Sequence, residues 1–337
     1  MKSIAIIIDK EGWAYDNTAH QIKKYLSKYY DIDIIPVEIF KDNVVKLFLL
    51  AENYDLMFIM WRGIISWLDS EFAKNYINKL GFEFEDFLNR FVKTKNIVTG
   101  VYDHLFLETE KERTDFILQN VRDYFVSSEK LKQIYNNFEK KPSYVIADGV
   151  DLELFKLKNE NKYKDIENKK IIIGWTGNSK FKDENDDDLK GINKVIKPAI
   201  EGLIEKGYNI ELKIADRNVK LIPHDEMPDY YNEIDLYVCA SRTEGTPNPV
   251  LEAMACGIPI ISTDVGIVSE VFGKEQKNFI IERTKESLQE KIEYIINNKS
   301  ILEQLSKENL EQIKNWSWKN KTDLFKQFFD DNINKDI

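Results

Sequence analysis

The chain has 337 residues, of which 43% are hydrophobic and 12% aromatic, enough to fill the interiors of two domains rather than one. Its net charge of −10 argues against non-specific binding of nucleic acid, because such binding needs a basic surface. The same charge gives no general attraction to anionic membranes, although a local basic patch would still allow peripheral membrane contact.

Cysteine usage and hydropathy indicate the compartment. Cys239 lies in an apolar run and Cys256 among small residues, which fits buried thiols in a reducing compartment better than a disulfide. Residues 1–9 hold an apolar run too short for a signal peptide, and no apolar run reaches the length of a membrane span. We therefore expect a soluble cytoplasmic protein.

Short apolar runs alternate with amphipathic segments along the first part of the chain. The runs predict strands at 4–8, 32–37, 56–61, 97–102, 124–127 and 145–147. The amphipathic segments predict helices at 18–29 and 44–50. Strands and helices in alternation predict a parallel sheet covered on both faces. The polar, lysine-rich stretch 151–169 has no strong period, and we interpret it as a linker between domains.

A second alternating series follows the linker. It predicts strands at 171–173, 211–215, 236–240, 258–261 and 279–281, and helices at 192–205, 228–232, 249–255 and 285–297. An apolar stripe between Trp316 and Asp331 predicts a last helix, whose simplest place is on the second domain. The predicted fold class is α/β, with two Rossmann-like domains whose parallel sheets face each other across a cleft. Ligands would bind beyond the carboxyl ends of the strands.

The segment 241–263, which reads SRTEGTPNPVLEAMACGIPIIST, predicts a polar loop, a helix and a strand. Asn248 suits the N-cap of that helix, and Pro249 suits its first position. Unpaired amides at a helix N-terminus bind anions, phosphate above all. The free donors would be the amides of Val250 and Leu251.

Two carboxylates, Glu244 and Glu252, flank this predicted anion site. They would repel phosphate, but they are well suited to accept hydrogen bonds from the hydroxyls of a sugar or a ribose. A phosphate pocket beside hydroxyl acceptors indicates a sugar nucleotide. The alternative is a capped core helix with two surface glutamates.

This segment resembles the retaining, nucleotide-sugar-dependent glycosyltransferases of the GT-B fold, glycosyltransferase family 4 (glycosyl transferases group 1). Glu244, seven intervening residues, Glu252 and the run AMACGIP at 253–259 carry the resemblance. It is strong in the second domain, whereas in the first it rests mainly on strand order, His104 and two turns.

The resemblance implies the organisation of the chain and its reaction. It implies an acceptor-binding domain at 1–155, a nucleotide-sugar-binding domain at 170–312, and a helix at 316–332 that returns to the first domain. It also implies that the sugar is transferred with retention and that the leaving phosphate takes the acceptor's proton.

Lys190 matches the lysine with which the family clamps the diphosphate, although an exposed lysine opening a helix is the alternative. The family's partner arginine has no counterpart in residues 174–182. Asn178, Lys180 or Lys182 would have to replace it. Arg217 would reach the phosphate or the base, or else pair with the neighbouring Asp216 at the surface.

The remaining candidates come from strand ends and from the same loops. His104 follows the strand at 97–102, where the resemblance places a histidine that contacts the transferred sugar or the acceptor; a structural role at the strand end is the alternative. Asp103 would orient His104, and Arg62, which also ends a strand, would meet an acceptor. The predicted catalytic residues are Glu244, His104 and Lys190, and the predicted acceptor contacts are Arg62 and Asp103. The predicted donor contacts are Gly177, Asn178, Lys190, Arg217, Gly245, Thr246, Asn248, Val250, Leu251 and Glu252.

Other ligands are disfavoured. The loop 9–14 holds one glycine instead of the three of a dinucleotide fingerprint, so a nicotinamide cofactor is not expected. The run 186–188, three aspartates, is similar to a metal-binding motif of another glycosyltransferase fold, but a polar loop leads into it, so we predict no essential metal and no cofactor. The expected donor is a UDP-sugar, and the acceptor would be a glycan, a lipid-linked sugar or a protein. An epimerase, an inverting transferase, an inert sugar-nucleotide-binding protein and a glycan-binding module are the alternatives.

Overall fold

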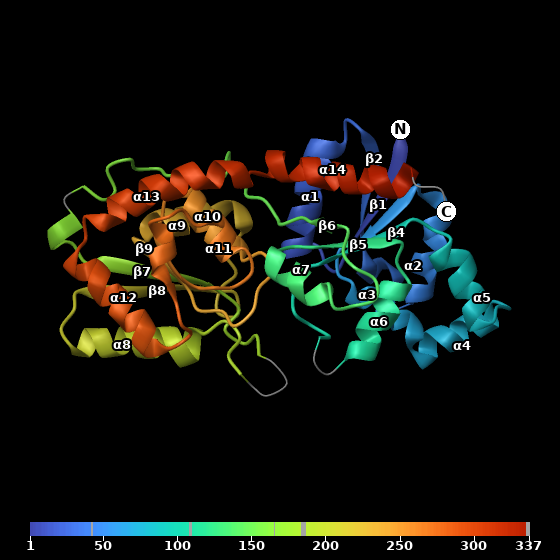
Figure 1. The fold of residues 1–337 in the computed structure, drawn as a ribbon, viewed down its shortest axis with the longest axis horizontal. Helices are drawn as coiled ribbons and strands as arrows, with labels where there is room; N and C mark the ends of the chain where they lie inside the picture. Colours follow the sequence, from blue (N-terminus) through green and yellow to red (C-terminus); the bar gives the residue numbers. More distant parts are fainter. Residues whose placement is uncertain (42, 108–109, 165, 183–186, 335–337) are drawn as a thin grey trace. The chain divides into compact units, whose positions relative to one another are not determined.

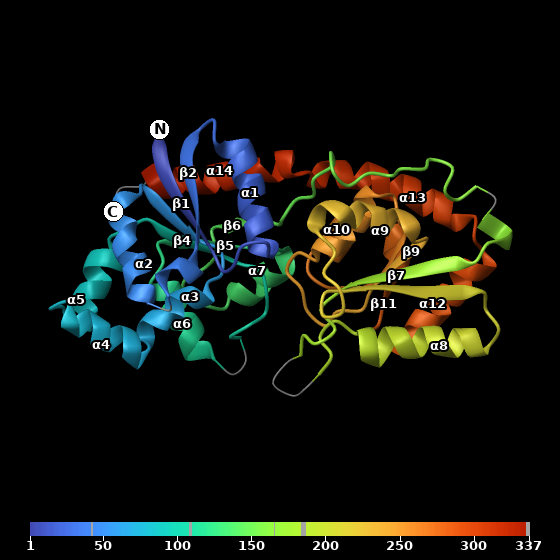
Figure 2. The ribbon, with the colours of Figure 1, turned by 180° about the vertical axis from the view of Figure 1, so that it is seen from behind.

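The computed structural model describes residues 1–41, 43–107, 110–164, 166–182 and 187–334. The chain divides into two compact units: unit 1 is Met1–Asp148 with Trp318–Ile337, and unit 2 is Gly149–Ser317. Each unit is built on one sheet with helices packed against it (Figures 1 and 2). None of the helices in the described part of the chain is long and apolar enough to cross a membrane.

The sheet of unit 1 is parallel throughout, in the order β2-β1-β3-β4-β5-β6. Its strands are β1 (Lys2–Ile8), β2 (Tyr30–Pro36), β3 (Leu56–Ile59), β4 (Ile97–Val101), β5 (Asp123–Val126) and β6 (Tyr144–Val145). β1 and β3 are buried along nearly their whole length, as expected for strands covered on both faces.

Alternate residues of these strands enter two different cores. Ile4 and Ile6 of β1 pack with α1 (Ala14–Leu26) and α14 (Trp318–Asn334). Ala5 and Ile7 point to the opposite face, because successive side chains of a strand alternate. That face is covered by helices that include α2 (Val44–Leu50), α3 (Gly63–Ser66), α4 (Glu71–Lys79), α5 (Phe84–Leu88) and α6 (Lys111–Gln119).

The terminal helix α14 completes the core of unit 1. Phe325, Phe328 and Phe329 are fully buried, and Phe325 meets the rings of Phe58 and Phe125 at centroid distances of 6.2 and 5.4 Å. The last helical segment of the chain therefore packs with the strands of the first part of the sequence.

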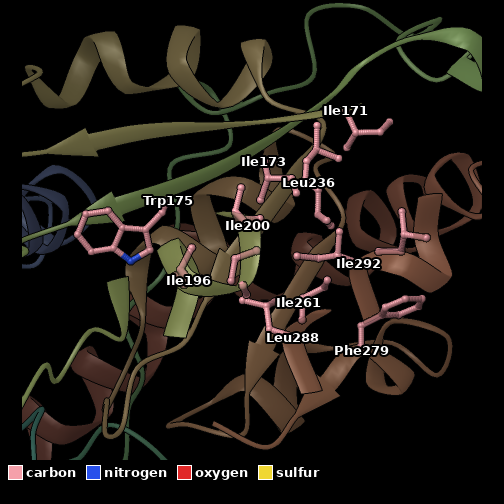
Figure 3. Close-up of a cluster of buried hydrophobic side chains, with 14 of the residues drawn as sticks. Ile171, Ile173, Trp175, Ile196, Ile200, Leu236, Ile261, Phe279, Leu288 and Ile292 are labelled. Carbon is pink, nitrogen blue, oxygen red and sulfur yellow. The ribbon is translucent and has the colours of Figure 1, made fainter. Parts of the chain in front are cut away.

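Unit 2 repeats the same plan. Its parallel strands follow the order β11-β10-β9-β7-β8. They are β7 (Ile171–Gly177), β8 (Ile210–Asp216), β9 (Leu236–Cys239), β10 (Ile260–Thr263) and β11 (Ile280–Ile281). One face packs on α8 (Lys197–Glu205), α12 (Lys285–Asn297) and α13 (Ile301–Gln312), and its buried cluster includes Trp175 and Leu288 (Figure 3). Buried side chains of α9 (Met227–Glu233) and α10 (Asn248–Ala255) complete the core.

Both sheets change winding direction beside their first strand. β1 lies between β2 and β3, and β7 lies between β8 and β9. Connections leave the two sides of such a point in opposite directions, which opens a crevice beyond the carboxyl ends of the strands. In unit 2 this position is flanked by the loops after β7 and β9, the two loops that carry Lys190 and Glu244.

The structure differs from the predicted elements in three places. The stretch 151–169, expected as a linker, belongs to unit 2, because Phe155, Tyr163 and Ile166 are buried there. Several helices that the hydropathy pattern did not reveal are present, among them α4, α6 and α13. Helix α10 begins at Asn248 after Pro247, so Asn248 is the first helical residue and not the N-cap.

Candidate active site

Lys190 and Glu244 meet at the carboxyl-end loops of β7 and β9. Lys190 Nζ lies 2.5 Å from Glu244 Oε1, and the two side chains are 26% and 16% exposed. Burial lowers the pKa of Lys190, but the charge of Glu244 and its hydrogen bond outweigh this, so the pKa is raised. Lys190 is therefore a firmly charged cation next to the polar loop of the motif.

Gly191 explains why the Lys190 loop lies so close to the end of β9. Its φ of 74° is left-handed, and a Cβ at this position would lie 2.3 Å from the carbonyl oxygen of Ala240. The amide of Arg242 donates to the carbonyl of Leu189 at 2.9 Å. Only glycine allows this approach, which explains why a glycine directly follows Lys190.

A second glycine shapes the loop of Glu244. A Cβ on Gly266 would lie 2.0 Å from the carbonyl oxygen of Gly245, so the loop after β10 presses directly on the backbone of the motif. At the start of α10 the amide of Val250 donates to the carbonyl of Pro247 at 2.9 Å. The prediction of a free Val250 amide is therefore wrong in this structure, because a turn at Pro247 precedes the helix. Leu251 is buried on the same helix, and Thr246 is half-buried in the loop.

Glu252 is the half-buried residue of α10 between buried neighbours, and two side chains hold its carboxylate. His224 Nε2 lies 3.1 Å from Oε1, and Tyr231 donates its hydroxyl to Oε2 at 2.7 Å. Burial and the nearby charge of Glu252 raise the pKa of Tyr231 well above its ordinary value, so this hydroxyl keeps its proton. Glu252 is therefore an oriented acceptor, with each oxygen already bonded once.

Gly177, Asn178 and Arg217 lie together at the ends of β7 and β8. The amide of Arg217 donates to the carbonyl of Gly177 at 3.0 Å, and the Arg217 side chain is exposed. The side-chain oxygen of Asn178 accepts from Asn218 Nδ2 and from the amide of Lys180. Lys180 is exposed and the side chain of Asn178 is already hydrogen-bonded. Which residue replaces the missing arginine of the family therefore stays a prediction.

A basic cluster surrounds Asp187 close to Lys190. Its carboxylate lies 2.7 Å from Lys194 Nζ, 2.7 Å from Arg242 and 3.8 Å from Arg283. The hydrogen bond from Lys194 and these charges lower the pKa of Asp187. The candidate motif at 186–188 is described only from Asp187 onward, since Asp186 lies outside the described residues. Among the described residues no group of three or more His, Cys, Asp and Glu could hold a metal ion.

In unit 1, Arg62 organises the loop that carries Asp103 and His104. Arg62 is 1% exposed, and its Nη2 lies 2.7 Å from Asp103 Oδ1 and donates to the carbonyl of Leu105 at 2.6 Å. Phe106, with a left-handed φ of 65°, lies under the guanidinium groups of both Arg62 and Arg113. Arg62 therefore contacts this loop, while Asp103 is partly exposed and His104 is half-buried.

Comparison with known proteins relates this chain to glycosyltransferases. Residues 152–312 match the family model of glycosyl transferases group 1. The matched residues lie within unit 2. The capsular polysaccharide biosynthesis glycosyltransferase CapM of Staphylococcus aureus is 28% identical over 224 residues, 57% of this chain and 57% of CapM. The chain thus spans little more than half the length of this relative. These matches support a transferase.

Solved structures show that both units of the chain follow the GT-B fold. Sucrose-phosphate synthase from Thermosynechococcus elongatus superposes with a TM-score of 0.67 at 14% identity, over 98% of this chain and 99% of that one. HepE from Anabaena, determined with UDP-glucose, gives 0.67 at 13% identity, over 98% of this chain and 100% of HepE. The residues that match the group 1 family model thus form one of two Rossmann-like parallel-sheet units.

Within unit 2, the structure brings the predicted residues into loops at one edge of the sheet. Lys190 is paired with Glu244, Gly245 lies against Gly266, and Gly177 lies beside Arg217. The sequence analysis missed His224 and Tyr231, the partners of Glu252. A histidine in a turn before a Tyr-Tyr pair was the available signal, but nothing in its spacing linked it to Glu252.

Proposed function

We propose that the protein is a retaining glycosyltransferase that moves a hexose-type sugar from a nucleotide diphosphate sugar, a UDP-sugar first of all, to a glycan, lipid-linked or protein acceptor. The observation that carries this proposal is the pairing of Lys190 with Glu244 at the point where the sheet of unit 2 changes winding direction. One cation and one hydroxyl acceptor there match the two ends of a sugar diphosphate.

The chemistry of the transfer fits these residues. Cleavage of the bond between the anomeric carbon and the diphosphate builds positive charge on the sugar and negative charge on the leaving phosphate. A protein accelerates this step most by stabilising the departing diphosphate. Lys190 is a charged, largely buried lysine in the loop after β7, where it can contact a diphosphate bound beside Glu244. A diphosphate beside it would be a second anionic partner, and it would leave Glu244 to accept hydrogen bonds from the sugar hydroxyls.

Glu252 is suited to the ribose. A carboxylate has about four lone-pair sites, and His224 and Tyr231 occupy one on each oxygen. The sites that remain can accept both ribose hydroxyls without any movement of the carboxylate. We expect the positive charge of Lys190 and backbone amides to serve the leaving group without an essential metal or cofactor, which addition of a chelator to the assay would test.

The names of similar proteins support the class of donor and product. CapM is named for capsular polysaccharide biosynthesis, and the HepE structure contains UDP-glucose. Arg62, Asp103 and His104 of unit 1 remain the predicted residues for the acceptor side. Since Arg62 is buried in this structure, we expect it to act by holding the loop of Asp103 and His104.

The donor site is tested by a panel of nucleotide sugars in a thermal-shift assay, because a bound ligand raises stability by mass action. Glu252→Ala should weaken donor binding by about 1–3 kcal/mol, since hydrogen bonds to a charged acceptor are lost. Glu201→Ala, a change at an exposed position of α8 in the same unit, is the matched control and should leave affinity unaltered. Unchanged affinity in Glu252→Ala would show that the ribose lies elsewhere.

The reaction is tested with Glu244→Gln, which keeps the size of the side chain and removes its charge. We expect turnover to fall while the protein stays folded, with a lower thermal unfolding midpoint because Lys190 loses the charge of its ion-pair partner. The anomeric configuration of the product separates a retaining from an inverting transferase. Donor binding without transfer to any acceptor would instead favour an inert sugar-nucleotide-binding protein.

A further inference from the structure

His224 lies in a short 3-10 turn (His224–Glu226) between β8 and α9, on the nucleotide side of the proposed site. Its ring is partly buried, with 38% of the side chain exposed, and its Nε2 lies 3.1 Å from Glu252 Oε1. The ring of Phe155 packs edge-on at a centroid distance of 5.2 Å. Phe155 and Glu252 thus both contact the imidazole.

Tyr231 holds the second oxygen of the same carboxylate. Its ring is fully buried and lies 6.0 Å from Phe155, so His224, Phe155 and Tyr231 form one packed group around Glu252. Tyr231 can donate only one neutral hydrogen bond, because its pKa is raised by burial and by Glu252. His224 is the partner of Glu252 whose charge can change near neutral pH.

We propose that His224 is a positioning residue that orients Glu252 for the ribose hydroxyls through a bond that strengthens when its ring is protonated, so that donor binding takes up a proton. This inference rests on the proposed function, because it requires Glu252 to contact the donor. It adds a role for a histidine outside the acidic motif and predicts a pH dependence that the motif alone does not.

The charges around His224 favour its protonated form. The groups that face it are Glu252 on α10, Asp225 in its own turn and Asp151 in the segment before Phe155. Burial lowers the pKa of His224, but the hydrogen bond and charge of Glu252, with Asp151 and Asp225, outweigh it, so the pKa is raised. Because a charged donor makes the stronger hydrogen bond, the protonated ring holds Glu252 more firmly in place for the ribose hydroxyls. Donor affinity should therefore fall as the pH rises through this titration.

The test is calorimetric titration of the full chain with UDP-glucose, and with GDP-mannose as a second probe, between pH 6 and 8.5. The diphosphate of a nucleotide sugar does not titrate in this range, so proton uptake reports the protein. Measurements at pH 7 in two buffers of different ionisation enthalpy give the number of protons taken up. For the wild type we expect a fraction of one proton and an affinity that falls several-fold across the range.

Three variants separate the contributions. His224→Gln keeps a neutral donor close to the position of Nε2, so it should keep the high-pH affinity and lose both proton uptake and the low-pH gain. His224→Ala should bind more weakly at every pH. His20→Asn, at an exposed histidine of α1 in unit 1, is the matched control and should keep the wild-type uptake and slope.

The possible outcomes separate failure of the proposed role of His224 from failure of the proposed function. If the wild type binds neither probe nor any other nucleotide sugar of the panel, both the proposed function and the proposed role of His224 are refuted. If the wild type binds and Glu252→Ala weakens binding, but His224→Gln keeps the wild-type proton uptake and pH slope, the proposed donor site stands and the role of His224 is overturned.

Discussion

Gly191 gives the sharpest test of how the structure places Lys190. Gly191→Ala puts a methyl group 2.3 Å from the carbonyl oxygen of Ala240 and 2.8 Å from its Cβ, at a residue whose φ is 74°. The left-handed conformation alone costs a non-glycine residue about 1–2 kcal/mol. Forcing a methyl group into occupied space costs about 1–3 kcal/mol more. Because backbone and a short side chain fill that space, the Lys190 loop must move away from β9.

Gly207 separates these two costs. It has a left-handed φ of 87° in the same unit, but a Cβ there would meet nothing within 4 Å. Gly207→Ala should therefore show the conformational cost alone, and Gly191→Ala should exceed it by about 1–3 kcal/mol. For a unit of this size each kcal/mol lowers the unfolding midpoint by about 2–4 °C, so the two variants are separable by calorimetry.

Donor affinity supplies the second measurement. Gly191→Ala should weaken binding of a nucleotide sugar at ligand concentrations where the variant is fully folded, because Lys190 moves with its loop. Gly207→Ala should bind like the wild type. Equal midpoints for the two variants, or unchanged affinity in Gly191→Ala, would refute the argument that this glycine sets the position of Lys190.

Three further predictions concern other parts of the chain. Phe325→Ala should destabilise unit 1 by about 3–5 kcal/mol in chemical unfolding, whereas Phe72→Ala, at a position 59% exposed, should be nearly neutral. Arg62→Met removes the partner of Asp103 and should speed hydrogen exchange in the loop 102–107 without changing affinity for UDP-glucose. The raised pKa of His224 contributes stability that is complete below about pH 6.5 and is lost as the pH rises through the pKa in the folded protein. The thermal unfolding midpoint of the wild type should therefore exceed that of His224→Gln by an amount that shrinks as the pH rises. A difference that stays constant with pH would contradict this.

Most of the fold could be predicted from local pattern. Strands such as Ile4–Ile8 and Ile171–Ile173 are continuous apolar runs, and such runs mark strands covered on both faces. Short helices such as α4 and α6 escaped the same reasoning. Each has only nine residues, too few for a helical period to stand out, and α6 is in addition weakly amphipathic, so their stability comes from packing.

Some parts of the candidate site could likewise be predicted from the sequence, and others could not. Glu244, Glu252 and the glycines between the strands belong to one segment, so the sequence, with the family resemblance, was enough to single them out as candidates. The helix start was predicted one residue late, because a capping side chain and a turn at Pro247 compete for the same position and propensity does not separate them. Val250 then lost its predicted free amide to that turn.

The sequence by itself determined that this is an α/β chain and predicted a motif for phosphate and hydroxyl groups, since strand runs, helix starts and glycine positions are local properties. Only the tertiary structure decided which distant side chains complete the motif. Lys190 meets Glu244 because a parallel sheet brings the ends of non-consecutive strands to one edge. His224 and Tyr231 meet Glu252 because α9, with the turn before it, packs beside α10. The separation of two residues along the chain does not show whether they are close in the folded protein, so these partners could be identified only from the packed structure.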